Sequence, residues 1–499
     1  MKILKTALDV LDDATIIKYI TEYERDQVPE FDKLWRYYLA DDVKIMDRKN
    51  TDINNPDNRI PIGYGRKIVN TYTGYAGRPR FTSIKANIEK DQSLETDIDS
   101  SEETKEKYLT KQEKYVNNIQ ETYNLNNEHI KTSRDYRNSA VFGVTYELLY
   151  LDSLTIPEDN KLKITAEVKF FCCDPREIIL LYDYSPEPKK HIGIHYTKVS
   201  NNYFKVEIYY SYASNGIVTY DMKKEDNDNT WKLSNRKTFT NFFDGVPIVP
   251  YYFGDDMLGV IKPVIGLIDA NDTLFSDSMN EFDRFAYAYL IMKKFGISDP
   301  GKQNAPGIVS QVLMTLKKKR IFENLPENAD IKFLTKDIPT NFIDFMAKQI
   351  HDQIHVQSHI PDFNMMTGAL SGAAIDRLLF DFENMVSSAE ADFDVGLIER
   401  IRLITGIYKL IGKEIGTPDD FTISHRRNIP LNLKEFADTA LVMKNAGFSA
   451  YLIADIMPDD IIPDVQAELA RQQKEAESMM PDIENVDYTD IESPEEVEE

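Results

Sequence analysis

Residues 262–294 read KPVIGLIDANDTLFSDSMNEFDRFAYAYLIMKK, the first of three long helical patterns in the chain. Apolar residues recur in it at three- and four-residue spacing, which is typical of an α-helix with one apolar face. They are Val264, Leu267, Ile268, Leu274, Phe275, Met279, Phe282, Phe285, Ala286, Tyr289 and Leu290. Unbroken, the helix would span roughly 45 Å. One small domain cannot bury so long a stripe, so the pattern predicts burial against neighbouring helices or subunits.

The opposite face of this predicted helix is polar. Asp269, Asp272, Ser276 and Asp283 fall close together there, because residues three and four apart share one side of a helix. The ordinary interpretation of such a face is that it is the solvated side of the helix.

Two more long helices follow. Residues 339–359 form the second, and residues 371–412 form the third, which would reach roughly 60 Å with Gly396 at a bend. Residues 360–371, IPDFNMMTGALS, separate them as a proline-opened loop of small, amide and thioether side chains. The first two helices are joined by a small mixed segment that contains the strand-like DIKFLTK (330–336). That order predicts a projecting helical hairpin.

The rest of the chain completes an α+β architecture. Residues 1–45 have helical spacing, whereas residues 140–250 alternate with a period of two and predict six to eight antiparallel strands. Residues 431–475 have the pattern of two or three short helices. The tail, residues 479–499, has nine acidic residues and no basic one, so we expect it to be disordered.

The chain of 499 residues is acidic. Its formal net charge is −24, with 42% hydrophobic and 28% charged residues. Such a surface repels nucleic acid and attracts basic partners or cations, although acidity also simply aids solubility. We expect no signal peptide and no membrane span. The only cysteines, Cys172 and Cys173, are adjacent and should face opposite sides of a strand, which fits a reducing cytoplasm.

The sequence contains no recognisable catalytic motif. It has no Walker loop, dinucleotide fingerprint, HExxH helix or nucleophile elbow, so we expect neither catalysis nor a cofactor. His351, His355 and His359 lie four residues apart on one face of the second helix, with Asp352 beside them. That spacing could seat a zinc ion, but imidazoles lining an interface or channel are the favoured interpretation, and we predict no metal.

The strongest basic run is KKKR, formed by Lys317, Lys318, Lys319 and Arg320. It allows three interpretations: a nuclear signal, a solvated face, or a contact with phosphate or with an acidic protein. A local basic cluster in so acidic a chain favours the contact.

Five segments, taken together and in this order, resemble phage portal proteins of the type found in tailed phages of Gram-positive hosts. They are NRIPIGYGRKIVNTYTGYAGRP (58–79), VPIVPYYFGDD (246–256), PVIGLIDANDTLFSDSMNEFDRFAYAYLIMK (263–293), HIPDFNMMTGALSGAAIDRLLFDFENM (359–385) and RRNIPLNLKEFADT (426–439). The resemblance covers roughly residues 55–475. The loop departs from the family pattern, because Met365, Met366 and Leu370 stand where relatives are often more polar.

This resemblance implies a mainly helical α+β portal fold with long stem and wing helices, a β-rich wing, a small α/β clip and a helical crown. The implied parts are 1–260 for the N-terminal helices and β-rich wing, 261–294 for the first stem helix, 295–337 for the clip, 338–359 for the second stem helix, 360–371 for the tunnel loop, 372–429 for the long wing helix and return strand, 430–478 for the crown, and 479–499 for the disordered acidic tail.

The resemblance also implies site residues. The tunnel loop would touch DNA in the channel through Asp362, Phe363, Asn364, Met365, Met366, Thr367 and Leu370. The stem would face the channel with four polar side chains, those of Asp269, Asp272, Ser276 and Asp283. The clip would contact the packaging motor, the head-completion protein or emerging DNA through Lys317, Lys318, Lys319 and Arg320.

The implied assembly is a homo-oligomeric ring, usually of twelve subunits, at one capsid vertex of the virion, assembled in the host cytoplasm. Double-stranded DNA would pass through it during packaging and ejection. The implied partners are the terminase packaging motor, the major capsid and scaffolding proteins and the head-completion protein, with no membrane. From the residues alone, two alternatives stay open: an acidic adaptor or scaffold that binds basic partners through a helical hairpin, and a metal-dependent hydrolase built on the histidine row.

Overall fold

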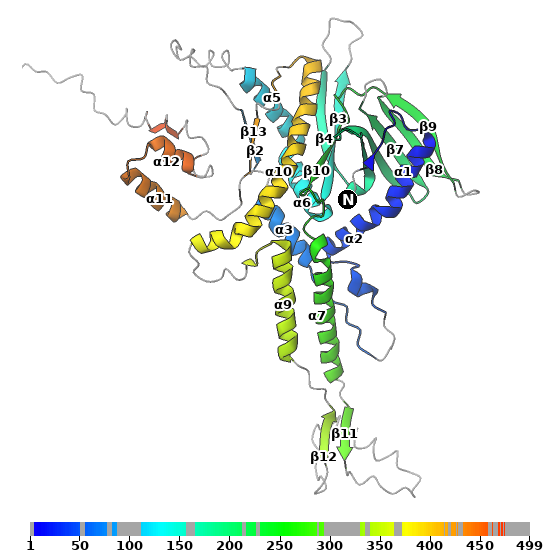
Figure 1. Ribbon diagram of the computed structural model, residues 1–499, viewed down its shortest axis with the longest axis vertical. Helices are drawn as coiled ribbons and strands as arrows, with labels where there is room; N and C mark the ends of the chain where they lie inside the picture. Colours follow the sequence, from blue (N-terminus) through cyan, green and yellow to red (C-terminus); the bar gives the residue numbers. More distant parts are fainter. Residues whose placement is uncertain are drawn as a thin grey trace, which may run out of the picture. The chain divides into compact units, whose positions relative to one another are not determined.

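In the computed structural model the chain divides into two compact units, Met1–Asn428 and Ile429–Glu499. The structure describes residues 4–49, 55–76, 82–86, 111–155, 165–211, 216–225, 230–286, 289–293, 330–334, 340–363, 372–413, 415–417, 421–425, 427, 433–457, 462, 468–469, 471–472 and 474. Long helices and antiparallel sheets coexist in it, which confirms the predicted α+β class (Figure 1). The predicted disordered tail lies outside the described residues.

Three helices come from the N-terminal region: α1 (Asp13–Asp26), α2 (Val28–Leu39) and α3 (Tyr64–Ala76). The carboxylate of Asp12 caps α1 by accepting a hydrogen bond from the amide of Thr15 at 3.1 Å. Buried residues such as Ile16 and Phe31 direct the apolar sides of α1 and α2 into the main core. The helical spacing of residues 1–45 therefore predicted these two helices correctly.

The predicted β-rich region forms two sheets. The smaller sheet has the order β10-β3-β4, with bounds Ile248–Tyr252, Val144–Thr155 and Thr165–Cys173. The larger has the order β1-β5-β6-β7-β8-β9, with bounds Leu4–Lys5, Ile178–Tyr182, Lys190–Ser200, Tyr203–Tyr210, Ile217–Lys224 and Trp231–Phe239. Strand β1 pairs with β5 in parallel, and the other neighbours in these two sheets are antiparallel, as predicted. Cys172 and Cys173 end β4 as free thiols, the first partly exposed and the second buried.

Helices α5 (Lys111–Asn126) and α6 (Glu128–Phe142) occupy a stretch to which the sequence assigned no helix. The buried side of α6 explains the omission, because it includes the polar residues Thr132, Asp135, Asn138 and Ser139. A helix that buries polar side chains lacks the apolar stripe by which periodicity identifies a helix.

Helix α10 (Gly372–Ile411) is a single 40-residue helix, close to the predicted 371–412. It packs against β10, and Gly396 permits the close approach, because a Cβ atom there would lie 2.5 Å from the ring of Tyr251. Gly396 therefore has a packing role at the position where a bend was predicted.

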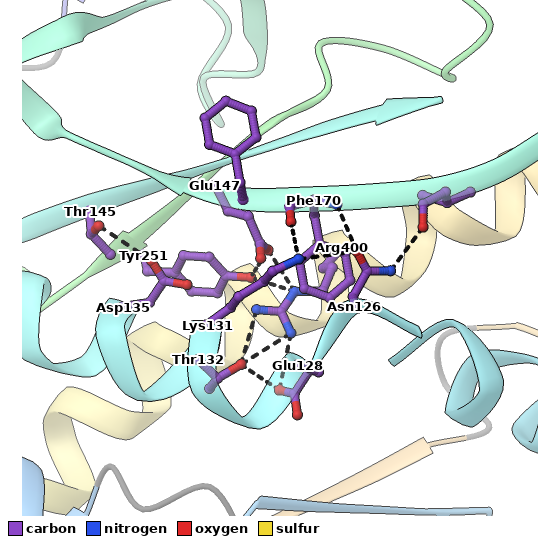
Figure 2. A network of polar contacts seen from close by, with 12 residues as sticks. Asn126, Glu128, Lys131, Thr132, Asp135, Thr145, Glu147, Phe170, Tyr251 and Arg400 are labelled. Carbon is purple, nitrogen blue, oxygen red and sulfur yellow. Dashed lines mark hydrogen bonds and ion pairs between the residues drawn. The ribbon is translucent and has the colours of Figure 1, made fainter. Parts of the chain in front are cut away.

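A buried ionic network joins α10 to the smaller sheet (Figure 2). Arg400, which is fully buried, donates from Nε to the carboxylate of Glu147 at 2.7 Å and to the hydroxyl of Tyr251 at 2.9 Å. Its other nitrogens reach Glu128 and Thr132 on α6. Burial raises the pKa of Glu147, while the charge of Arg400 opposes that shift. The network holds α6, β3, β10 and α10 in fixed positions relative to one another.

Helices α7 (Ile265–Ala286) and α9 (Thr340–Ser358) lie side by side (Figure 1). The prediction for α9 is confirmed, but the helix predicted over 262–294 is too long. Residues 262–264 are a short 3-10 turn, and Tyr289–Lys293 is strand β11, paired antiparallel with β12 (Asp330–Leu334). The apolar run YLIMK suits a strand as well as a helix, and pairing with the predicted strand DIKFL decides between them.

A further two-stranded sheet and the second unit complete the described chain. Strand β13 (Phe421–His425) pairs with β2 (Thr82–Ala86). The second unit contains α11 (Leu433–Asn445) and α12 (Ala450–Ile456), where short helices were predicted. Among the described helices, none combines the length and apolar character that crossing a membrane would require.

Candidate functional site: the paired helices α7 and α9

The polar face of α7 is covered by the chain's own N-terminal region. The amide of Ile62 donates to Oδ1 of Asp272 at 3.0 Å, and the amide of Ile60 donates to Oγ of Ser276 at 3.0 Å. Asp272 and Ser276 are consequently only 1% and 0% exposed. Residues 58–62, here called the strap, therefore lie along this face of the helix.

The strap and one tyrosine also hold the remaining polar residues of this face. Asn58 donates its backbone amide to Oδ1 of Asn280 at 2.7 Å and its side-chain amide to Oδ2 of Asp283 at 2.6 Å. Tyr37 donates its hydroxyl to Oδ1 of Asp269 at 2.5 Å. Asn280, Asp283 and Asp269 therefore all accept hydrogen bonds from donors of the same chain.

The predicted channel-facing role is therefore wrong for Asp272 and Ser276. Periodicity correctly grouped them on one face, but the donors that cover this face come from the strap, more than 200 positions earlier in the sequence. Burial raises the pKa of Asp272 to about 6, although the Ile62 amide opposes the shift. For Asp269 and Asp283, which are only partly buried, the channel-facing role stays a prediction.

Large apolar side chains on both helices are exposed instead. Along α7, the base is buried through Ile268, whereas farther along the helix Phe282 is 63% exposed. On α9, Ile354 is buried and Phe342 is 60% exposed. The exposed set, here called the outer stem surface, is Phe275, Met279, Phe282, Phe342 and Phe345. Exposed apolar side chains of this size in two adjacent helices indicate an interaction surface.

A polar cluster lies where the second helix leads into the loop 360–371. Nδ1 of His351 is 2.6 Å from the hydroxyl of Tyr64, and its Nε2 is 2.9 Å from Oδ2 of Asp362. Nδ1 of His355 is 2.8 Å from the carbonyl oxygen of Ile360. We call His351, His355 and Asp362, with their neighbours Tyr64 and Lys67 on α3, the histidine cluster.

The predicted histidine row is thus divided. Helix α9 ends at Ser358, and His359 adopts a left-handed backbone conformation with a φ of 56°. Its Nδ1 lies 2.9 Å from Oδ2 of Asp381 on α10, away from the other two imidazoles. Within the described part of the chain, His351, His355 and Asp362 offer ligand atoms within 4.8 Å of one another, whereas Asp352 is not in this group.

The other predicted site residues are only partly described. Asp362, predicted to touch DNA, is largely buried and lies 3.6 Å from Nζ of Lys67 as well as against His351. Phe363 is exposed. The remaining residues of these two predicted sites lie outside the described residues: Asn364, Met365, Met366, Thr367, Leu370, Lys317, Lys318, Lys319 and Arg320.

Sequence reasoning missed the strap and the partners of the histidines. Tyr64, Lys67 and the strap belong to the segment 58–79, which is quoted above for its family resemblance. Backbone amides such as that of Ile60 leave no pattern in a sequence, because every residue except proline carries one. No signal in the sequence matched the helix that carries Tyr64 and Lys67 to α9.

The two adjacent helices thus expose an apolar surface that is suited to contact with another molecule. Comparison with protein families identifies the family to which the chain belongs. The chain belongs to the family described as phage portal protein, SPP1 Gp6-like, whose model matches residues 17–482. It is therefore a bacteriophage portal protein, a head-tail connector and a component of the virion.

Two solved structures are similar over most of their length at low identity. One is described as the neck of a native GTA particle computed with C12 symmetry, with 9% identity, a TM-score of 0.42, and coverage of 79% of this chain and 89% of that one. The other is described as the neck of an empty GTA particle computed with C6 symmetry, with 11% identity, a TM-score of 0.41, and coverage of 78% and 87%. No curated protein sequence matches this chain.

Proposed function

We propose that this chain assembles into a closed homo-oligomeric ring of about twelve subunits, whose central channel passes double-stranded DNA during packaging and ejection. The ring would occupy one vertex of the capsid and join head to tail. Its role would be structural and non-catalytic, with assembly in the host cytoplasm. Membership of the portal family supports this proposal.

The outer stem surface is the observation that carries the proposal. The strap uses the polar face of α7 inside the subunit, so Phe275, Met279 and Phe282 are left for contact with something else. Phe342 and Phe345 add exposed aromatic area on α9. Identical neighbouring subunits would cover this surface on every copy at once, which a closed ring achieves.

The charge of the chain fits a conduit through which DNA must move. A ring of twelve copies at −24 each would carry roughly −290 formal charges. Phosphates are repelled by such a field, and binding that depends on releasing counterions needs many Lys and Arg contacts. DNA would therefore pass without adhering to the walls.

The partner contacts belong to the same proposal. The basic run Lys317, Lys318, Lys319 and Arg320 would contact the terminase motor, the head-completion protein or emerging DNA, and other surfaces would contact the major capsid and scaffolding proteins. These roles, and the division into wing, stem, clip and crown, stay predictions.

Light scattering of size-separated protein tests the proposal. Replacing Phe275 and Phe345 together by Gln should convert the oligomer to smaller species, because buried aromatic residues at an interface become polar. Phe239→Gln is the matched control, since Phe239 is about as exposed but lies on β9. If the double variant stays fully assembled, or if Phe239→Gln dissociates the oligomer equally, the outer stem surface is not the assembly interface.

A further inference from the structure

The hydrogen bonds of His355 fix its tautomer. Its Nδ1 lies 2.8 Å from the carbonyl oxygen of Ile360, and a carbonyl only accepts, so Nδ1 carries the proton and donates it. An ammonium group only donates, so Nε2 of His355, which Nζ of Lys67 faces, is the acceptor of that contact. Nε2 therefore retains its lone pair, and this lone pair faces Nζ of Lys67 at 3.5 Å.

His351 offers the same arrangement in one of its tautomers. Its Nδ1 lies 2.6 Å from the hydroxyl of Tyr64, which can accept as well as donate. A carboxylate only accepts, so in this structure Nε2 of His351 donates its proton to Oδ2 of Asp362 at 2.9 Å and Nδ1 accepts from Tyr64. A cation at Nε2 would select the other tautomer, in which Nδ1 donates to Tyr64 and the Nε2 lone pair binds the cation. In that tautomer two imidazole nitrogens and one carboxylate would offer ligand atoms that lie within 4.8 Å of one another.

Lys67 supplies the positive charge that such an arrangement requires. Its Nζ lies 3.6 Å from Oδ1 of Asp362 and 3.5 Å from Nε2 of His355. The side chain of Lys67 is partly exposed, and its flexible stem allows it to withdraw into solvent. The ammonium group therefore occupies the place of an exchangeable cation.

We propose that His351, His355 and Asp362 bind a divalent transition-metal ion of the zinc class, which displaces Lys67 and takes water as its fourth ligand. The candidate ligand atoms lie within 4.8 Å of one another, so closing around an ion requires side-chain movements of about 1 Å. Two imidazoles, one carboxylate and water form a donor set that suits zinc. Tyr64 and the Ile360 carbonyl would orient the two rings through Nδ1, as outer contacts of ligating histidines do.

The ion would join three parts of the chain. His351 and His355 belong to α9, Asp362 belongs to the loop 360–371, and Tyr64 on α3 holds one ring. A bound ion would therefore anchor the first residues of the loop to the end of α9. This inference concerns the single subunit and holds whether or not the chain forms a ring.

Calorimetric titration of the full-length protein with zinc chloride near neutral pH tests the site. We expect one ion per chain, with His355→Gln and Asp362→Asn each weakening affinity at least tenfold. Lys67→Met should strengthen affinity, because it removes the competing ammonium group without removing a ligand. His359→Gln is the control, since His359 is adjacent to α9 but pairs with Asp381, and its affinity should not change.

Several results would overturn the assignment. One is equal zinc affinity in the wild type and in His355→Gln; another is a loss of binding in His359→Gln. Unchanged affinity in Lys67→Met would also contradict it, and this variant keeps the test valid should a ligand variant fail to fold. Cobalt(II) gives an independent readout, because the site predicts the intense visible absorption of a four-coordinate ion, and the weak absorption of a six-coordinate ion would contradict it.

Discussion

The amide nitrogen of Ile62 donates a hydrogen bond of 3.0 Å to Oδ1 of Asp272, although 210 positions separate the two residues. This pair fixes the strap along the polar face of α7. An amphipathic helix usually buries its apolar face and exposes its polar face. In α7 the polar face is buried within the subunit, while Phe275 and Phe282 are exposed. Such an arrangement makes sense for a subunit whose apolar surface is completed by assembly.

Asp272 should make the stability of the protein depend on pH. Its pKa of about 6 in the folded chain exceeds the value of about 3.9 for an unfolded aspartate. The folded state therefore binds the proton more tightly, and this residue's contribution to stability increases as pH falls from 7 toward 4. Asp272→Asn should raise the free energy of unfolding at pH 8 by on the order of 1 kcal/mol.

Urea denaturation of wild type and Asp272→Asn at a series of pH values checks this. The difference between the two proteins should be largest above pH 7 and should shrink below pH 5. A constant difference across this range would mean that Asp272 titrates normally.

Gly396 should not tolerate even a methyl group. A Cβ atom there would lie 2.5 Å from the Tyr251 ring and 2.9 Å from the carbonyl oxygen of Pro250. Gly396→Ala should therefore destabilise the protein by about 1–3 kcal/mol through overpacking. Gly406→Ala is the control in the same helix, because its nearest neighbour would be 3.5 Å away and alanine favours helix. Equal melting temperatures for the two variants would contradict this packing account.

Arg400 should be essential for stability. Arg400→Met leaves the buried carboxylate of Glu147 without its cation, at a cost of about 3–5 kcal/mol. Adding Glu147→Gln should restore part of that loss, because no unpaired charge then remains. Arg402→Met, which removes a partly exposed arginine, should change stability by less than about 0.5 kcal/mol. Chemical denaturation measures all three, and a double variant no more stable than Arg400→Met would argue against the charge pairing.

The loop 360–371 should act on DNA through soft apolar contact, if the proposed channel exists. Met365 and Met366 have flexible thioether side chains that adapt to a moving surface, and no basic residue lies between positions 361 and 374. Replacing both by Gly should leave assembly intact and reduce the length of DNA packaged. Replacing both by Leu keeps the apolar contact and is the control. Normal DNA filling in the Gly variant would leave the loop as a passive connection.

Periodicity predicted the elements whose buried side is apolar. Helix α9 and helix α10 lie within one residue of the predicted bounds, because long amphipathic patterns depend on local spacing alone. Helix α6 was missed because its buried side holds Asp135 and Asn138, and β11 was misassigned because YLIMK is apolar in either conformation.

The site was predicted less completely than the fold. The sequence correctly grouped Asp272 with Ser276, and His351 with His355, since each pair is four residues apart in one helix. What contacts each pair depends on long-range packing, in which backbone amides of the strap and the side chain of Lys67 take part. No local pattern encodes those contacts.

Electron microscopy of the purified full-length chain at micromolar concentration would show directly whether the chain forms the proposed ring. We expect closed rings of uniform size with a central hole, because each outer stem surface must be covered by a neighbouring copy. A field of single subunits, confirmed by a monomer mass in solution, would contradict the proposed ring and the channel that depends on it.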